Sequence, residues 1–327
     1  MNNLRREIVR QLREARSVLV LTHYRPDGDA VGSQLALGLA LQRTGKKVSL
    51  WNDDPVPAKF RFLPGSEQIT TPSRQPRAFD VVVAVDSSTW SRLGTAAERI
   101  ARRRCLINID HHVSNERYGD LNWVEPNASA TGQLVYRLIQ TARWPIERDV
   151  ATALFVALST DTGSFSYANT TAESLRMAAK LVASGVDVGT VSRHVYESYP
   201  SARLHLLQRV LAELKLIHHR RIAYYWVTNE MLEESRAKRE DIEGVIDYAR
   251  SIDSVVVAIL FEELPEPRRV RVSFRSKDRR VAVDAIAKQF GGGGHPEAAG
   301  ARIEGAPATV ERNVLAATRA ALRAAGL

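Results

Sequence analysis

Four separated segments of the chain combine carboxylate and imidazole side chains, the residue types that bind divalent metal ions. Three of them come directly after apolar runs, and the fourth follows a helical pattern. In chain order they are His23-Tyr24-Arg25-Pro26-Asp27-Gly28-Asp29, Asp86, Asp110-His111-His112 and Asp161. Carboxylates that are brought close together repel one another, so such a cluster needs cations to persist. The residue types therefore predict a metal site, provided that the fold brings the segments together.

Each segment also has a simpler structural explanation when it is taken alone. Asp27 and Gly28 could form a turn, and Asp29 or Asp86 could cap a helix. His111 and His112 could be packed and hydrogen-bonded inside the core. The joint pattern favours the metal site, because three acidic segments end apolar strands and a parallel sheet would bring them to one rim.

The mixture of carboxylates and imidazoles also bears on the identity of the metal. It suits manganese or a similar first-row ion better than calcium, which prefers oxygen ligands alone. Zinc is a further option, although its usual thiolate ligands are missing. The only cysteine, Cys105, lies in the apolar run 105–109 and is expected to pack in the core.

Apolar runs that resemble buried strands alternate with helical patterns in the first half of the chain. The expected strands are 17–22, 48–51, 81–86 and 106–110, and the expected helices are 31–43, 149–159 and 172–184. Strands that are apolar on both faces and alternate with helices predict a doubly wound parallel sheet. A long helical pattern over 191–217 would then connect to a second, smaller α/β unit. Its expected strands are 221–227, 254–262 and 269–275, and its expected helix is 283–290.

The order of the acidic segments resembles the four motifs of the DHH phosphoesterase superfamily. These motifs are His-x-x-x-Asp-x-Asp, an Asp at a strand end, Asp-His-His and a later Asp. The resemblance implies two divalent cations, with Mn²⁺ favoured and Mg²⁺, Co²⁺ or Zn²⁺ as alternatives. It assigns one ion to His23, Asp27 and Asp86, and the other to Asp29, Asp86, His111 and Asp161. Asp86 would bridge the ions, His112 would face the substrate phosphate, and Asp110 would orient a neighbouring histidine, so Asp86, Asp110 and His112 form the expected catalytic group.

The second half carries two features that suit phosphate binding. Residues 268–280 are rich in arginine, which could be the solvated face of a hairpin or a phosphate-binding surface. The run Gly291-Gly292-Gly293-Gly294-His295 could be a flexible linker, but it lies inside a unit, where glycines let backbone N–H groups approach a ligand. This run resembles the glycine-rich signature of the DHHA1 domain. The resemblance implies that Arg275, Ser276 and the loop from Gly291 to His295 bind the nucleotide end of a substrate, with Lys277 as a weaker candidate.

The resemblance also implies a domain division and a function. We expect a DHH catalytic domain over 1–189, a helical connector over 190–217 and a mixed-sheet DHHA1 domain over 218–327. The likeness is greatest to bacterial nanoRNases, which hydrolyse short oligoribonucleotides (nanoRNA) and dephosphorylate pAp. Hydrolysis of cyclic di-AMP or pApA is the alternative. Inorganic pyrophosphatase, single-strand DNA exonuclease and a nucleotide sensor without catalysis rank lower.

Composition sets weaker limits. The chain has 327 residues, of which 44% are apolar, and a net charge of +9, which suits polyanion binding or solubility alone. A single cysteine excludes a disulfide within the chain, and no apolar run is long enough to cross a membrane. We therefore expect a cytoplasmic protein that does not enter the membrane. A homodimer through the DHH domain is an open alternative.

Overall fold

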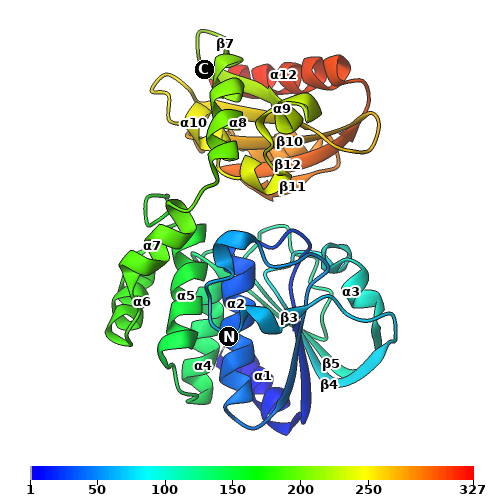
Figure 1. The fold of residues 1–327 in the computed structure, drawn as a ribbon, viewed down its shortest axis with the longest axis vertical. Helices are drawn as coiled ribbons and strands as arrows, with labels where there is room; N and C mark the ends of the chain where they lie inside the picture. The colour runs from blue at the N-terminus through cyan, green and yellow to red at the C-terminus, as the bar shows by residue number, and fades with distance from the viewer. Residues whose placement is uncertain (1) are drawn as a thin grey trace. The chain divides into compact units, whose positions relative to one another are not determined.

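The computed structural model describes residues 2–327, which divide into two compact units. One unit ends at Ser198 and the other spans Tyr199–Leu327. Each unit has its own six-stranded sheet, as Figure 1 shows. Among the described residues, no helix is both long and apolar enough to span a bilayer.

The first sheet is entirely parallel, as the sequence predicts. Its order is β3-β2-β1-β4-β5-β6. The strands are β1 (Ser17–Leu21), β2 (Lys47–Trp51), β3 (Ile69–Thr70), β4 (Arg77–Val85), β5 (Ile100–Asp110) and β6 (Leu121–Val124). The direction of the strand order reverses between β1 and β4. In such sheets a ligand binds at the carboxyl ends of the strands beside this reversal, and here these ends lead into His23 and Asp86.

The two faces of the first sheet are covered unequally. The helices of this unit are α1 (Asn2–Glu14), α2 (Gly28–Gln42), α3 (Thr95–Glu98), α4 (Thr131–Ala142), α5 (Arg148–Asp161), α6 (Ala172–Ala183) and α7 (Val188–Tyr196), with short 3-10 turns η1 (Ala58–Phe60), η2 (Ser66–Gln68) and η3 (Trp90–Leu93). The long helices pack on the face that carries Val18 and Val20. The face that carries Leu19 and Leu21 is covered by η3 and α3. The fold is doubly wound, but its second layer is thin.

Helices α2 and α5 pack against each other with almost no side-chain material between them. A β-carbon added to Gly32 would lie 2.4 Å from the backbone oxygen of Ala153, and one added to Gly28 would lie 2.4 Å from Oγ1 of Thr160. Glycine is therefore required at both positions for the helices to approach this closely. This contact fixes the first turn of α2 against the last turn of α5, which ends at Asp161.

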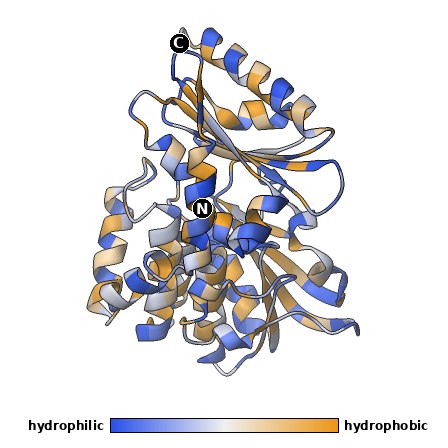
Figure 2. Ribbon diagram, turned by 45° about the horizontal axis from the view of Figure 1, so that its top comes forward, coloured by the Kyte–Doolittle hydropathy of each residue, from blue (hydrophilic) through white to orange (hydrophobic). Residues whose placement is uncertain are grey.

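The second unit has a mixed sheet, again as expected. Its order is β11-β12-β10-β9-β8-β7, and β8 and β9 form its parallel pair. The strands are β7 (Lys215–Ile217), β8 (Ile222–Val227), β9 (Val257–Glu263), β10 (Arg269–Ser276), β11 (Gly293–His295) and β12 (Ala298–Glu304). Around them lie α8 (Ser201–Ala212), α9 (Asn229–Ser235), η4 (Arg239–Ile242), α10 (Ile246–Arg250), α11 (Val283–Lys288) and α12 (Pro307–Ala324). Figure 2 shows apolar and polar residues alternating along the helices. The two cores of this unit are built from apolar residues of the strands and helices.

The expected continuous helix over 191–217 is wrong. The segment contains the end of α7, the separate helix α8 and the short strand β7. Pro200 explains the break, because proline removes a backbone donor and disfavours helical geometry at the residue before it. The two helices also belong to different cores. Val191 of α7 packs in the first unit, whereas Leu206 and Val210 of α8 are buried in the second.

Candidate metal centre and phosphate-binding residues

Asp86 lies at the centre of the candidate metal site. Its carboxylate is almost fully buried, and its two oxygens face different histidines. Oδ2 is 3.6 Å from Nε2 of His23, whereas Oδ1 is 3.7 Å from Nε2 of His111. Thr131 donates a hydrogen bond of 2.9 Å to Oδ1 and thereby fixes the orientation of the carboxylate. One carboxylate thus presents one oxygen to each of two ligand groups.

The first ligand group contains His23, Asp27 and Asp86, with one ligand atom of each within 4.8 Å of the others. His23 follows β1, and its Nδ1 lies 2.8 Å from the backbone oxygen of Tyr24, so Nδ1–H donates there and Nε2 is left to face Asp86. Asp27 is the N-cap of α2, where its Oδ1 accepts the backbone N–H of Ala30 at 3.0 Å. Its other oxygen is not used by the cap.

The second ligand group contains Asp29, His111 and Asp161. Nε2 of His111 lies 3.8 Å from Oδ2 of Asp29 and 3.5 Å from Oδ2 of Asp161. Nδ1 of His111 is 3.2 Å from the backbone oxygen of Ala128, which again leaves Nε2 directed at the carboxylates. The six residues that the sequence assigned to metals are therefore brought together in the first unit.

Asp29 is held at the N-terminus of α4, where unpaired backbone N–H groups favour an anion. It accepts the N–H groups of Thr131 at 2.6 Å and Gly132 at 2.9 Å. Burial, together with the carboxylates of Asp86 and Asp161, nevertheless raises the pKa of Asp29 well above its usual value. A metal ion bound to the Asp29 carboxylate would therefore favour its ionised form over the protonated one. This electrostatic demand fits a bound metal ion.

Distances within the two ligand groups suit shared ions better than direct hydrogen bonds. The nitrogen–oxygen separations of 3.5–3.8 Å exceed a normal hydrogen bond. Two atoms that each lie about 2.1 Å from one ion are separated by roughly 3–3.5 Å at ordinary coordination angles. Modest closure of these groups would therefore complete the coordination of an ion. The donor set of the second group, the carboxylates of Asp29 and Asp161 and the imidazole of His111, matches a first-row divalent cation once the shared Asp86 carboxylate is added.

Asp110 and His112 form a different kind of cluster. His112 Nδ1 lies 2.7 Å from Oδ1 of Asp110, and Asn115 donates to Oδ2 at 2.6 Å. Atoms of Asp86, Asp110 and His112 also lie within 4.8 Å of one another, but the short hydrogen bond pairs His112 Nδ1 with Asp110 and removes that nitrogen from metal binding. Burial alone would lower the pKa of His112, yet Asp110 and Asp86 raise it to about 10. The imidazole is therefore cationic at neutral pH in the metal-free protein.

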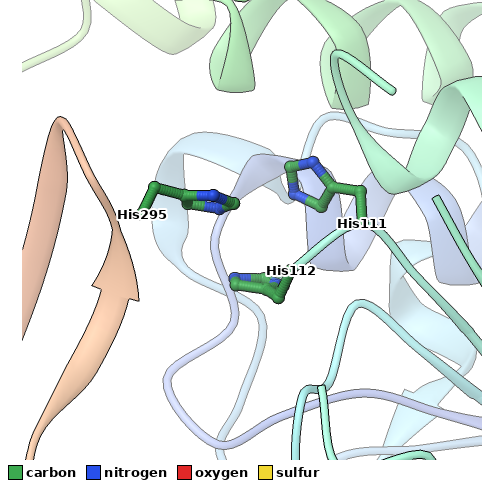
Figure 3. A group of neighbouring side chains, drawn as sticks. All are labelled: His111, His112 and His295. Atoms are coloured by element: carbon green, nitrogen blue, oxygen red, sulfur yellow. The ribbon is translucent and has the colours of Figure 1, made fainter. Parts of the chain in front are cut away.

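The imidazole rings of His111 and His112 lie side by side after β5, as Figure 3 shows. Their centroids are 4.9 Å apart and the rings are inclined at 69°. Adjacent residues on an extended chain direct their side chains to different sides. Of the two rings, His111 alone joins the Asp29 and Asp161 group, whereas His112 is bonded to Asp110.

Three residues of this centre were not identified from the sequence. Thr131 links Asp29 and Asp86 through its backbone and its hydroxyl, and Asn115 positions Asp110. Arg92 lies on η3, and its backbone oxygen accepts the N–H of Tyr24 at 2.8 Å, next to His23. Within residues 2–327 the half-buried Arg92 guanidinium makes no ion pair, and its charge acts on His112. Nothing in the local sequence around these residues indicates such roles, since each depends on contacts between distant segments.

The expected substrate-binding residues meet on the second sheet. Arg275 on β10 is opposite Ala298 on β12, and Ala298 is in turn opposite His295 on the edge strand β11. Residues in register across adjacent strands point to the same face, so Arg275 and His295 flank the small Ala298 side chain about 10 Å apart. Ser276 follows Arg275, and its hydroxyl donates to the backbone oxygen of Asp278 at 2.9 Å.

Most of the neighbouring cations have partners within the same unit. Arg279 pairs with Glu297 at 2.8 Å, and Arg280 pairs with Asp278 at 2.6 Å. Lys277, the weaker candidate, donates to the backbone oxygen of Ile252 at 2.6 Å, so its ammonium group is already engaged within this unit. The guanidinium of Arg275 bonds only to the backbone oxygen of Phe274 among the hydrogen bonds of the described chain. Part of this basic segment is thus a solvated, ion-paired hairpin face. Arg275 differs, because no acidic side chain of the described chain pairs with it.

The glycine run is not a loop throughout, because Gly293–His295 forms strand β11. Two of its glycines are required by the packing of this hairpin. A β-carbon on Gly292 would lie 2.2 Å from the backbone oxygen of Gly300, and one on Gly294 would lie 2.5 Å from that of Ala298. A β-carbon on Gly293 would meet nothing within 4 Å. The packing of the hairpin therefore does not require glycine at position 293. A ligand that approaches the backbone closely would explain why this residue has no side chain.

Two matched variants separate these explanations. Gly292→Ala should lower the free energy of unfolding by about 1–3 kcal/mol, because the new methyl group overlaps the backbone of β12. Gly293→Ala should leave it within about 0.5 kcal/mol of the wild type. Chemical denaturation of the purified proteins measures both values. Equal stability of the two variants would contradict the packing argument.

Comparison with known proteins agrees with this geometry. Residues 17–158 match the model of the DHH family, N-terminal domain, and residues 220–324 match that of the DHHA1 domain. A bifunctional oligoribonuclease and PAP phosphatase, NrnA, from Thermus thermophilus is 35% identical over 293 residues, which are 88% of this chain and 84% of that protein. The protein of the same name from Bacillus subtilis is 24% identical over 303 residues, which are 92% of this chain and 93% of that protein.

Solved structures share the fold. An exopolyphosphatase-related protein from Bacteroides fragilis has a TM-score of 0.91 at 25% identity, covering 100% of this chain and 98% of its own. RecJ from Thermus thermophilus, in complex with Mn²⁺, has a TM-score of 0.52 at 14% identity, covering 98% of this chain and 55% of its own. The two family matches and the relative at 35% identity establish that the chain belongs to the DHH phosphoesterase family and carries a DHHA1 domain.

Proposed function

We propose that this protein hydrolyses short oligoribonucleotides to mononucleotides and dephosphorylates pAp to AMP. The observation that carries the proposal is the shared carboxylate of Asp86, which faces a separate ligand group with each oxygen. The names of the relatives from Thermus thermophilus and Bacillus subtilis, both oligoribonuclease and PAP phosphatase, support this choice of substrate.

The residues present fit two divalent cations, with manganese favoured. His23, Asp27 and Asp86 would hold one, and Asp29, Asp86, His111 and Asp161 would hold the other. When bound, such ions supply a water of lowered pKa and neutralise charge on the attacked phosphate. The buried carboxylates support this assignment, because burial and the neighbouring carboxylates of Asp86 and Asp161 disfavour an ionised Asp29 unless further positive charge is added.

The protein contributes its own cationic groups beside the metal ligands. His112 would donate from Nε2 to a phosphate oxygen, because Asp110 holds the proton on Nδ1 and raises the pKa of the ring. Arg92 would add a guanidinium whose planar donors match phosphate oxygens. Hydrogen bonds that are fixed before the substrate arrives stabilise developing charge without reorganisation.

The second unit would hold the nucleotide end of the substrate through Arg275, Ser276 and the segment from Gly291 to His295. Gly293→Ala, which the packing tolerates, should raise KM if the backbone there approaches a phosphate.

We assign catalysis to 1–189 and substrate binding to 218–327, with 190–217 as the segment that joins them. A cytoplasmic location and a homodimer through the first domain complete the proposal, the former because the chain has a single, buried cysteine.

A substrate panel tests the proposed function. The purified protein is assayed with Mn²⁺, Mg²⁺, Co²⁺ and Zn²⁺ on pAp, pApA, cyclic di-AMP and a five-nucleotide RNA. We expect release of mononucleotides from the RNA and of phosphate from pAp, with the highest rate in Mn²⁺. Hydrolysis confined to pApA and cyclic di-AMP would establish the alternative specificity, and no turnover of any substrate would overturn the proposal.

A further inference from the structure

An arginine-rich projection of the first sheet lies at the opposite end of the strands from the metal centre. Strands β4 and β5 continue past their neighbours, since Arg77 pairs with Ile100 and Phe79 pairs with Arg103, whereas β1 joins β4 only from Val81 onward. Figure 1 shows the two strands side by side. We call the arginines on and beside this projection the arginine arm: Arg74, Arg77, Arg99, Arg102, Arg103 and Arg104.

The arginine arm carries a large excess of positive charge. None of its six guanidinium groups forms an ion pair with any residue from 2 to 327, although many arginines elsewhere do, among them Arg10 and Arg209. The one acidic side chain within the paired strands here is Asp80, which accepts the backbone N–H groups of Ser17 at 2.9 Å and Arg16 at 2.7 Å. These hydrogen bonds, together with the charge of Arg104, lower the pKa of Asp80, so it offsets only one of the six charges. The arm has charge on both faces of the ribbon, with Arg77 and Arg103 on the face of Trp90 and Phe79, and Arg104 on the face of α1. These like charges repel one another, so a bound polyanion would stabilise the arm.

Aromatic rings hold two members of the arm in place without neutralising them. The guanidinium carbon of Arg103 lies 5.2 Å from the centroid of Trp90, and that of Arg77 lies 5.5 Å from Phe79 and 5.7 Å from Trp51. Cation–π contacts of this kind orient a guanidinium while leaving its N–H groups available. Guanidiniums that are fixed before binding lose less side-chain entropy on contact with phosphate.

The arm is separate from the metal centre. Arg103 precedes Asp110 by seven positions along β5, which corresponds to about 23 Å at the rise of an extended strand. A dinucleotide at the metal centre would not extend that far. The arm therefore suits a longer chain of phosphates than the proposed substrates.

We propose that the arginine arm is a second RNA-binding surface, which holds single-stranded RNA longer than the oligonucleotides that the metal centre hydrolyses. The choice of RNA among polyanions rests on the proposed function. Arginine is the side chain best suited to such a partner, since it pairs with phosphate oxygens and stacks on bases. Binding of this kind weakens with added salt, because each bound phosphate releases counterions.

The test compares two double variants that remove equal charge. Arg77→Gln/Arg103→Gln removes two arm residues that lie on the same face of the sheet, and Arg10→Gln/Arg209→Gln removes two exposed arginines that are ion-paired elsewhere. The probe is a 24-nucleotide poly-uridine RNA with both ends blocked, and fluorescence anisotropy with the metal-loaded protein gives Kd from 50 to 300 mM KCl. We expect the arm variant to bind about tenfold more weakly, with a salt slope smaller by about 0.7 for each phosphate that the variant no longer neutralises, and the control to bind like the wild type.

Three results would overturn the proposal: unchanged affinity in the arm variant, equal weakening in the control, or tighter binding of the arm to phosphatidylserine vesicles than to RNA. Hydrolysis of pApA by the same proteins reports on the proposed function separately, and we expect both double variants to retain the wild-type rate. If Arg103 serves only to cover Trp90, the arm variant should lose thermal stability and keep its RNA affinity, which also counts against the proposal.

Discussion

Asp86→Asn should lower kcat on pApA by about 10⁴-fold or more and reduce the bound manganese below two ions per chain. The reason is that this one carboxylate faces both ligand groups, so its loss weakens both ions and the charge stabilisation that phosphoryl transfer requires. Asparagine is a better replacement than alanine here. The backbone of Asp86 has a φ of 55°, and asparagine adopts this left-handed region more readily than most residues.

Asp149→Asn is the matched control for this variant. Asp149 is also a carboxylate of the first unit, but it lies at the start of α5 and pairs with Arg43, twelve positions before Asp161. This separation is about 18 Å along a helix. The control should keep its metal content and activity within about twofold of the wild type. Metal content by mass spectrometry and steady-state rates measure both effects, and an Asp86→Asn protein with two ions and a wild-type rate would remove the basis of the proposed function.

His112→Asn should lower kcat by about 10²–10³-fold while leaving both ions in place, because the ring is bonded to Asp110 and contributes no atom to the two main ligand groups.

Asp110→Asn should act through His112. The Asp110 carboxylate is the main group that raises the pKa of His112 to about 10, so replacing it with a neutral amide should lower the pKa of His112. The His112 imidazole then loses its proton at a lower pH than in the wild type.

NMR titration of the ring in metal-free wild type and Asp110→Asn measures that shift directly. A purely structural role for Asp110 would change thermal stability without moving the titration of His112. Loss of one metal ion from His112→Asn would show instead that this histidine is a ligand, and the proposed division of roles within Asp-His-His would then be wrong.

The sequence predicts the convergence of the metal-binding segments for a simple reason. Each of three acidic segments follows a strand of one parallel sheet, and the carboxyl ends of such strands share an edge. His23, Asp86 and Asp110 could thus be placed together without knowledge of any contact. That they bind manganese stays a prediction, because the geometry shows ligand atoms at suitable distances and does not select an ion.

Other features depend on contacts that no local pattern encodes. Thr131 and Asn115 are ordinary polar residues until the fold brings them to Asp86 and Asp110. The glycine run forms a strand because β12 supplies a partner for it, although glycine alone disfavours strands. The break between α7 and α8 is different, since Pro200 is visible in the sequence and proline interrupts a helical pattern wherever it falls in the interior.

The tight contact between α2 and α5 sets the width of the second ligand group. Asp29 lies in the first turn of α2 and Asp161 ends α5, so the distance between these two carboxylates depends on how closely the two helix backbones approach. A hydrogen atom in place of a methyl group at Gly32 permits this close approach. Replacing Gly32 with a larger residue would therefore change the separation of Asp29 and Asp161 while every candidate ligand remained chemically intact.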